Sequence, residues 1–395
     1  MSQDSIVIVS ASRTPMGSFQ GGLSLATASE LGAAAIAAAV KKAGIAGEDV
    51  DEVIMGNVLP AGQGQAPARQ ASLGAGLPLD AGCTTINKMC GSGMKAAMLA
   101  HDLILAGSNN LMVAGGMESM SNAPYLLPKA RGGMRMGHGV VQDHMFLDGL
   151  EDAYDKGRLM GTFAESCADK YSFSREEQDQ FAITSLERAQ SAVNDGKFAD
   201  EITPVEIKQR KEMIEVSQDE SPFKANIEKI PHLRPAFRED GTVTAANSSS
   251  ISDGGAALVL MKESEAEKRG LSPLARILGH ATHAQAPQWF TTAPVGAIEK
   301  CLAKLNLKVK DVDLFEINEA FAVVTMAAMR ELSLDHERVN IHGGACALGH
   351  PIGASGARIM VTLLSAMERY DFTTGLAALC IGGGEATAVV VERTN

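Results

Sequence analysis

The sequence is poor in the features that mark several large classes of protein. Only 4% of its 395 residues are aromatic, and its 35 basic residues are outnumbered by 47 acidic ones, which gives a formal net charge of −12. A nucleic-acid partner is not expected, because phosphate binding requires a basic face. No apolar run is long enough to span a bilayer, so no membrane partner is expected either.

Cysteine is also scarce. Six cysteines in a chain of this length form no disulfide framework, and no CxxC pair suggests zinc. The start, Met1-Ser2-Gln3-Asp4-Ser5, lacks the basic beginning of a secretory signal, and the Arg-Thr-Asn end carries no peroxisomal address of the Ser-Lys-Leu type. We therefore expect a cytoplasmic, reducing location that keeps the thiols free, and no metal ligands.

What the sequence does contain is an internal repeat. Residues 29–57 and 293–319 both read as an apolar helix, a short stop and an apolar strand, and Val50 and Val312 are 262 positions apart (312 − 50). Such self-similarity predicts two copies of one helix–strand–helix–strand unit. Short apolar strands that alternate with helices predict a mostly parallel sheet, covered by helices, in each copy.

A segment of different character separates the two copies. It carries several prolines and an amphipathic helix that starts at Ser174 with the capping-box pattern Ser-Arg-Glu-Glu. We therefore divide the chain into a first half, residues 1–120 plus 248–270, an insertion, residues 121–247, and a second half, residues 271–395.

Three stretches place a reactive side chain among glycines. Cys90 comes just before Gly91-Ser92-Gly93 and a helical pattern, His350 lies in Gly349-His350-Pro351-Ile352-Gly353, and Cys380 ends an apolar strand before Gly382-Gly383-Gly384. A helix N-terminus favours a thiolate, so a lowered pKa is expected for Cys90. Each residue alone could be a buried cysteine at a turn or a solvated histidine. Together they supply a nucleophile, a base and a second thiol for proton transfer.

These stretches, with Asn318-Glu319-Ala320-Phe321-Ala322, resemble the motifs of the thiolase family, and the resemblance runs over nearly the whole chain. It implies an α/β fold with duplicated α/β/α/β/α layers and an inserted loop domain. It also implies acyl-CoA and CoA as substrates and products, no separate cofactor, and assembly as a homotetramer.

The resemblance further implies roles for single residues. Cys90 would be acylated, His350 would activate it and donate a hydrogen bond to the thioester oxygen, and Cys380 would move the proton of the substrate α-carbon. The backbone N–H groups of Gly382 and Cys90 would form one oxyanion pocket. Asn318 would position a water in another, although it could equally cap the helix that follows.

Residues that hold the acyl-CoA are implied in the same way. Leu233, Ala236, Phe237 and Ser249 would line the path of pantetheine and adenine, and Lys224 would replace an arginine common in the family. Basic side chains for the phosphates are offered by the insertion, at Lys208, Arg210, Lys211, Lys224, Arg234 and Arg238. Met160 would contact the substrate, in Leu159-Met160-Gly161, where short-chain thiolases commonly read His-Met-Gly. Phe290 stands where many of them have a methionine, and a phenylalanine there resembles thiolases that accept a 2-methyl branch.

The resemblance implies the activity of an acetyl-CoA C-acetyltransferase, which condenses two acetyl-CoA into acetoacetyl-CoA and CoA through an acyl-Cys90 intermediate. Two alternatives stay open at this point. One is a degradative 3-oxoacyl-CoA thiolase of β-oxidation, and the other is an inactive thiolase-like protein that binds lipid.

Overall fold

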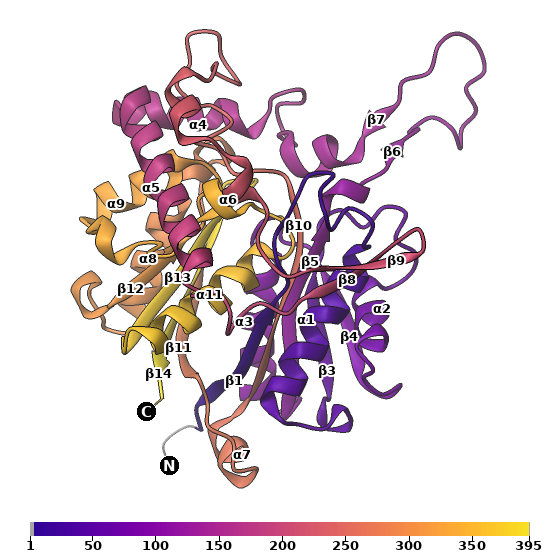
Figure 1. Ribbon diagram of the computed structural model, residues 1–395, viewed down its shortest axis with the longest axis vertical. Coiled ribbons are helices and arrows are strands. Elements are labelled where there is room, and N and C mark those ends of the chain that lie inside the picture. The colour runs from indigo at the N-terminus through magenta and orange to yellow at the C-terminus, as the bar shows by residue number, and fades with distance from the viewer. Residues whose placement is uncertain (1–3, 395) are drawn as a thin grey trace.

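The computed structural model describes residues 4–394 and contains two similar halves. In Figure 1 the first is indigo to purple except for its strand β10, and the second is orange to yellow. In each half a sheet lies between helices. The first half contains β1 (Ile6–Arg13), β3 (Glu52–Gly56), β4 (Gly82–Ile86), β5 (Leu111–Ser119) and β10 (Ser252–Lys262), with α1 (Ala28–Ala43), α2 (Pro67–Gly74) and α3 (Ser92–Leu105). The second half contains β11 (Ala275–Ala284), β12 (Leu314–Ile317), β13 (Thr374–Ile381) and β14 (Glu385–Arg393), with α8 (Ala293–Lys304), α9 (Ala322–Leu332), α10 (Ala345–Leu348) and α11 (Ser355–Arg369).

The repeat seen in the sequence is a repeat of strand order. The sheet runs β12-β13-β14-β11-β1-β10-β5-β3-β4, so that β1-β10-β5-β3 of the first half corresponds to β11-β14-β13-β12 of the second. The two halves join where β1 pairs with β11, with Val7 opposite Arg276 and Ile8 opposite Ala275.

The expectation of mostly parallel sheets is wrong. Only β3 with β4, β3 with β5 and β12 with β13 are parallel, whereas the other pairs of neighbouring strands in this sheet are antiparallel. The reason is that β13 returns directly as β14 through the glycine turn at residues 382–384, and the insertion leads back into β10 from the far end of β5. A chain that re-enters the sheet at the end where it left forms an antiparallel pair.

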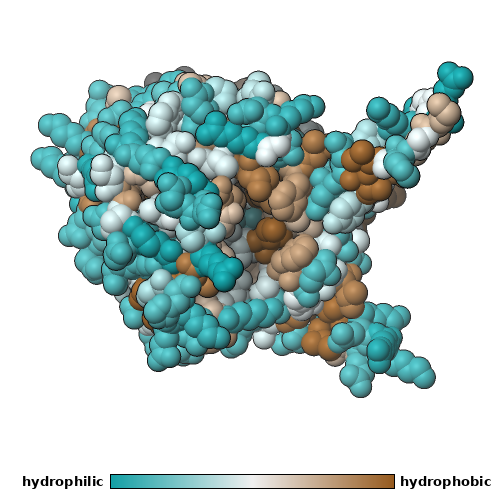
Figure 2. All heavy atoms as spheres, turned by 90° about the horizontal axis from the view of Figure 1, so that it is seen from above, coloured by the Kyte–Doolittle hydropathy of each residue, from teal (hydrophilic) through white to brown (hydrophobic). Residues whose placement is uncertain are grey.

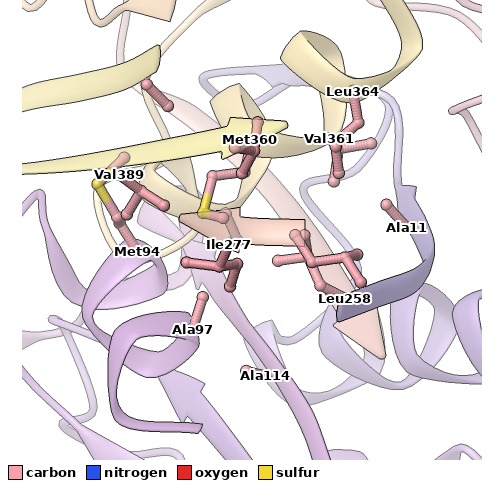
Figure 3. Close-up of a cluster of buried hydrophobic side chains, with 14 of the residues drawn as sticks. Ala11, Met94, Ala97, Ala114, Leu258, Ile277, Met360, Val361, Leu364 and Val389 are labelled. Carbon is pink, nitrogen blue, oxygen red and sulfur yellow. The ribbon is translucent and has the colours of Figure 1, made fainter. Parts of the chain in front are cut away.

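Helices fill three layers around the two parts of the sheet. α1 and α2 cover the outer face of the first half, and α8 and α9 cover the outer face of the second. Between the two parts lie α3 and α11, in a core to which both halves contribute (Figure 3). Met94 of α3 and Met360 of α11 meet there with Leu258 and Ile277 from the two parts of the sheet. The layers are therefore α/β/α/β/α.

Two glycines allow α3 and α11 to approach closely at their first turns. A Cβ on Gly93 would lie 2.7 Å from the backbone nitrogen of Ala357, and a Cβ on Gly356 would lie 2.4 Å from that of Met94. Each glycine belongs to a small-Ser-Gly triplet, and the two triplets occupy corresponding places in the repeat. The crossing brings together the loops that precede the two helices.

The insertion contains β6 (Tyr125–Leu126), β7 (Gln142–Asp143), α4 (Met160–Tyr171), α5 (Arg175–Asn194), β8 (Val205–Gln209), β9 (Glu212–Val216) and α6 (Ser221–Lys224). The predicted helix start is confirmed: Ser174 caps α5, and Glu177 completes the capping box. The three-part division by residue number stays a prediction. In the structure, β5 ends at Ser119 and β10 begins at Ser252.

A buried ionic cluster ties the insertion to β1. Arg13 is fully buried, with its Nε 2.5 Å from Glu201 and its two terminal nitrogens 2.7 and 2.9 Å from the carboxylate oxygens of Asp219. Buried charge of this kind is tolerated only when it is paired. Among the described helices, none combines the length and apolar character that a membrane crossing requires.

Candidate active site

The loops that precede α3 and α11 place the candidate nucleophile and base. Cys90 lies two residues before the first residue of α3, and His350 lies five residues before that of α11. Because the two helices cross at their first turns, both loops open into the same space. Cys380, near the end of β13, and the glycine turn that follows it complete this group.

Their side chains surround a cavity of about 660 Å³. Figure 2 shows hydrophobic residues gathered around a hollow on the upper face of the molecule. The reactive residues that line the cavity are Cys90, His350 and Cys380, and the predicted oxyanion donor Gly382 lines it as well. Residues of the insertion, among them Phe146, Leu150, Met160 and Phe237, also line the cavity.

The lowered pKa predicted for the Cys90 thiol is wrong for the resting site. Burial raises the pKa of the Cys90 thiol to about 11, against hydrogen bonds from the backbone N–H groups of Gly382 and of Cys90 itself, which lower it. The residue stands just outside the first turn of α3, and loss of solvation outweighs the helix dipole there. At neutral pH, Cys90 is therefore a thiol that requires a base.

His350 can act as that base. Its Nδ1 lies 2.6 Å from the hydroxyl oxygen of Ser355, and this hydroxyl donates to Pro351 O at 2.9 Å. Ser355 therefore accepts a hydrogen bond from Nδ1–H, which leaves Nε2 as the unprotonated nitrogen. Burial lowers the pKa of His350 to about 3, so the imidazole is neutral at physiological pH.

Asn318 lies beside His350 and outside the lining of the cavity. Its Nδ2 is 3.5 Å from His350 Nε2, and its backbone N–H donates to Ala378 O at 3.0 Å. The buried Oδ1 has no hydrogen-bond partner among residues 4–394. The alternative that Asn318 caps the following helix is wrong, because the residue before α9 is Phe321.

Cys380 is the more deeply buried of the two reactive thiols, with 1% of its surface exposed. Burial, with a further contribution from the nearby Cys90, raises its pKa well above the ordinary value. In the resting site Cys380 is therefore protonated, and it becomes a base only after it has given its proton to another group.

Most of the predicted substrate contacts line the same cavity, but two do not. Met160, Ala236, Phe237, Ser249 and Phe290 are part of the lining. Leu233 lies outside it, and Lys224 lines an adjacent hollow, where its ammonium is 3.6 Å from Glu220.

The basic side chains of the insertion are in part neutralised by acidic neighbours. Arg238 pairs with Asp169 at 2.7 Å, Asp240 at 3.1 Å and Glu165 at 3.7 Å. This cation already has three carboxylate partners, so it is a poor candidate for a phosphate contact.

Sequence reasoning missed several residues that position the site. Glu118, at the end of β5, is fully buried and accepts hydrogen bonds from the backbone N–H groups of Val58 and Gly353, both at 2.9 Å. It thereby fixes the loop that carries His350 to the first half. Lys88 and Glu385 form an ion pair that connects the Cys90 loop to the turn after Cys380. The sequence offered no signal for these pairings beyond the position of Glu118 two residues after Gly115-Gly116.

Comparison with known proteins agrees with this geometry. Residues 6–264 match the model of the thiolase N-terminal domain, and residues 271–393 match that of the thiolase C-terminal domain. The chain is 51% identical over 391 residues to acetyl-CoA acetyltransferase 1 of Arabidopsis thaliana, covering 98% of this chain and 94% of that protein. It is 50% identical to the mitochondrial acetyl-CoA acetyltransferase of Rattus norvegicus, covering 98% and 91% respectively.

Solved structures give the same result. The crystal structure of the Bacillus anthracis acetyl-CoA acetyltransferase superposes with a TM-score of 0.97 at 42% identity and covers 99% of both chains. A thiolase from Ascaris suum, solved in complex with coenzyme A, superposes with a TM-score of 0.93 at 41% identity, covering 99% of this chain and all of that one. The fold and the site define an acyl-transferring α/β enzyme, and the chain belongs to the thiolase family.

Proposed function

We propose that this thiolase is an acetyl-CoA acetyltransferase, which condenses two acetyl-CoA into acetoacetyl-CoA and CoA in a reversible reaction. The observation that carries the proposal is the convergence of Cys90, His350, Cys380 and Gly382 on one cavity. The names of the relatives support acetyl transfer over β-oxidation as the activity. A complete set of reactive groups argues against an inactive lipid-binding protein.

The first half-reaction acetylates Cys90. His350 Nε2 takes the thiol proton as the sulfur attacks the thioester carbonyl, since a thiol with a pKa of about 11 is not ionised beforehand. The N–H groups of Gly382 and Cys90 stabilise the oxyanion. The carbon–sulfur bond to CoA then breaks, and the departing CoA thiolate takes the proton of Cys380. The products are acetyl-Cys90, CoA, an imidazolium and the Cys380 thiolate.

The second half-reaction restores the resting state. The Cys380 thiolate takes a proton from the methyl group of a second acetyl-CoA, and the resulting carbanion attacks the carbonyl of acetyl-Cys90. The bond to the Cys90 sulfur breaks, and this sulfur regains the proton held by His350. Asn318 supports the thioester oxygen of the second substrate through a water, with His350 as the other donor. Each proton is accounted for without a redox step.

The acyl preference follows from the cavity wall. Phe290 is 3% exposed, lines the cavity and packs edge-on against Phe163 with ring centroids 6.2 Å apart. We assign Phe290, with Met160, to the walls that contact the acyl group, and we propose that a 2-methyl branch is accepted against the flat ring. Ala236, Phe237 and Ser249 would contact pantetheine.

The experiment that tests this proposal is CoA-dependent thiolysis of acetoacetyl-CoA, 2-methylacetoacetyl-CoA and a long-chain 3-oxoacyl-CoA. Cys90→Ala serves as the control. We expect both short substrates to be cleaved faster than the long one, and Phe290→Met to change the ratio of the two short substrates. Preference for the long chain would instead indicate a β-oxidation thiolase, and no Cys90-dependent cleavage would leave the fold without the activity.

We also propose a homotetramer. An arm that includes β6 and β7, residues 125–143, projects from the molecule (Figure 1). It exposes a set of large apolar side chains, namely Tyr125, Leu127, Met134, Met136, Val140 and Val141. β4 lies at the edge of the sheet, where a second strand can pair with it. Light scattering of the purified chain tests the assembly, and Met136→Glu is expected to weaken it. The cytoplasmic location stays a prediction.

A further inference from the structure

Two histidines and an aspartate meet at the seam between the two halves, outside the lining of the reactive cavity. His101 and Asp102 belong to α3 of the first half, and His280 belongs to β11 of the second. One donor atom from each lies within 4.8 Å of the other two, and among residues 4–394 this is the only such group of three histidine, cysteine or carboxylate side chains.

The donor atoms are spaced in a way that suits a small cation. Asp102 Oδ1 is 3.0 Å from His101 Nδ1 and 2.9 Å from His280 Nε2. Donors arranged tetrahedrally about 2.0 Å from a zinc ion lie roughly 3.3 Å apart. The planes of the two imidazole rings are at 89° to each other, with centroids 5.0 Å apart, so the rings do not stack. One nitrogen of each ring contacts the Asp102 carboxylate. Only small side-chain shifts separate this arrangement from a coordinated ion.

Solvent can reach the group from one side. The side chains of His101 and His280 are 13% and 11% exposed, whereas that of Asp102 is 51% exposed. An ion could therefore enter through the aspartate side and retain water as a fourth ligand. The ammonium of Lys304 donates a hydrogen bond to the backbone carbonyl of His280 at 3.5 Å.

We propose that His101, Asp102 and His280 bind one divalent transition-metal ion of the zinc class. Imidazole nitrogen with a carboxylate is a donor set for zinc, cobalt and nickel, and it does not suit magnesium or calcium. In the ion-free state each ring donates an N–H to Asp102. Binding moves that proton to the other ring nitrogen, so the rings stay neutral and the aspartate supplies the only negative charge.

The ion would cross-link the two halves of the protein. It would join the last turns of α3 to β11, roughly 14 Å along the helix axis from the end that follows Cys90. It takes no part in acyl transfer, for which no metal is required. No spacing motif in the sequence indicates the site, since Asp102 and His280 are 178 positions apart.

The test is a titration of the full-length protein, freed of metal by a chelator, with Zn²⁺ and with Co²⁺ as a spectroscopic probe. The wild type is expected to bind one ion per chain at this group, to show the visible absorption of four-coordinate cobalt, and to melt at a higher temperature as free zinc increases. Asp102→Asn keeps an oxygen that accepts both ring N–H groups but is a weak metal ligand. It should lose binding at least tenfold while it retains thiolysis.

Three further variants make the test decisive. His138→Asn, on the exposed arm, should bind as the wild type does. The thiols of the reactive cavity could also bind zinc, so Cys90→Ala is titrated in parallel. If Asp102→Asn binds as tightly as the wild type, or if the bound ion is lost only in Cys90→Ala, the assignment is overturned. If Asp102→Asn loses thiolysis, His280→Gln provides the same comparison of metal binding with the wild type.

Discussion

His350 Nδ1 lies 2.6 Å from the hydroxyl oxygen of Ser355, and the hydroxyl donates in turn to Pro351 O. This pair decides which imidazole nitrogen can accept a proton. Because Ser355 is the second residue of a small-Ser-Gly triplet, one short sequence both allows the close approach of α11 to α3 and orients the base.

Replacing Ser355 with alanine is therefore expected to lower kcat roughly 10–100-fold, because the tautomer with Nε2 unprotonated loses its support. KM for acetoacetyl-CoA should change little, since Ser355 does not line the cavity. Steady-state thiolysis separates the two parameters. If the activity falls because KM rises while kcat is unchanged, the orienting role of Ser355 is contradicted.

Cys380→Ser should still form the acyl-enzyme but lose condensation. A hydroxyl can occupy the buried site, yet its pKa is too high for it to become the base that takes an α-proton. Exchange of the acetyl-CoA methyl protons with deuterated water should fall at least about a thousandfold. Near-normal condensation by this variant would show that another group moves the proton.

Stability should fall below pH 6.5 because of His342. Burial lowers its pKa to about 4, whereas an unfolded histidine titrates near 6.5. Between these values only the unfolded state takes up the proton, so the free energy of unfolding decreases as the pH falls. Relative to His342→Gln, the wild type should lose roughly 2 kcal/mol between pH 6.5 and 5. Urea unfolding of both proteins at several pH values measures this difference, and parallel curves would rule the effect out.

Arg13→Ala should destabilise the protein by about 3–5 kcal/mol, because it leaves Glu201 and Asp219 buried without their cation. Arg369→Ala, which breaks an exposed pair with Asp200, should stay within about 1 kcal/mol. Equilibrium unfolding of the two variants provides the comparison. Equal effects would mean that the buried cluster contributes no more than a surface ion pair.

The sequence predicts well what depends on neighbours along the chain. The capping box at Ser174 and the internal repeat are short-range or periodic patterns, and the structure confirms both. Glycines beside Cys90, His350 and Cys380 likewise mark the loops that meet in the cavity, because close backbone approach excludes larger residues there.

What the sequence could not give depends on contacts between distant segments. Strand direction follows from the path of the connections, and the pKa of Cys90 follows from how deeply several segments bury it. Leu233 stands three positions before the lining residue Ala236 but lies outside the lining, and Lys224 lines a different hollow. Glu118 works through Gly353, which lies 235 positions away.

The central claim is that acetyl transfer passes through a thioester on Cys90. Its most direct test is mass spectrometry of peptides from protein quenched after brief mixing with acetyl-CoA. The account predicts one acetyl group per chain on the peptide that contains Cys90, in the wild type and in Cys380→Ser, and none in Cys90→Ala. An acetyl group on another residue, or its persistence in Cys90→Ala, would contradict the account.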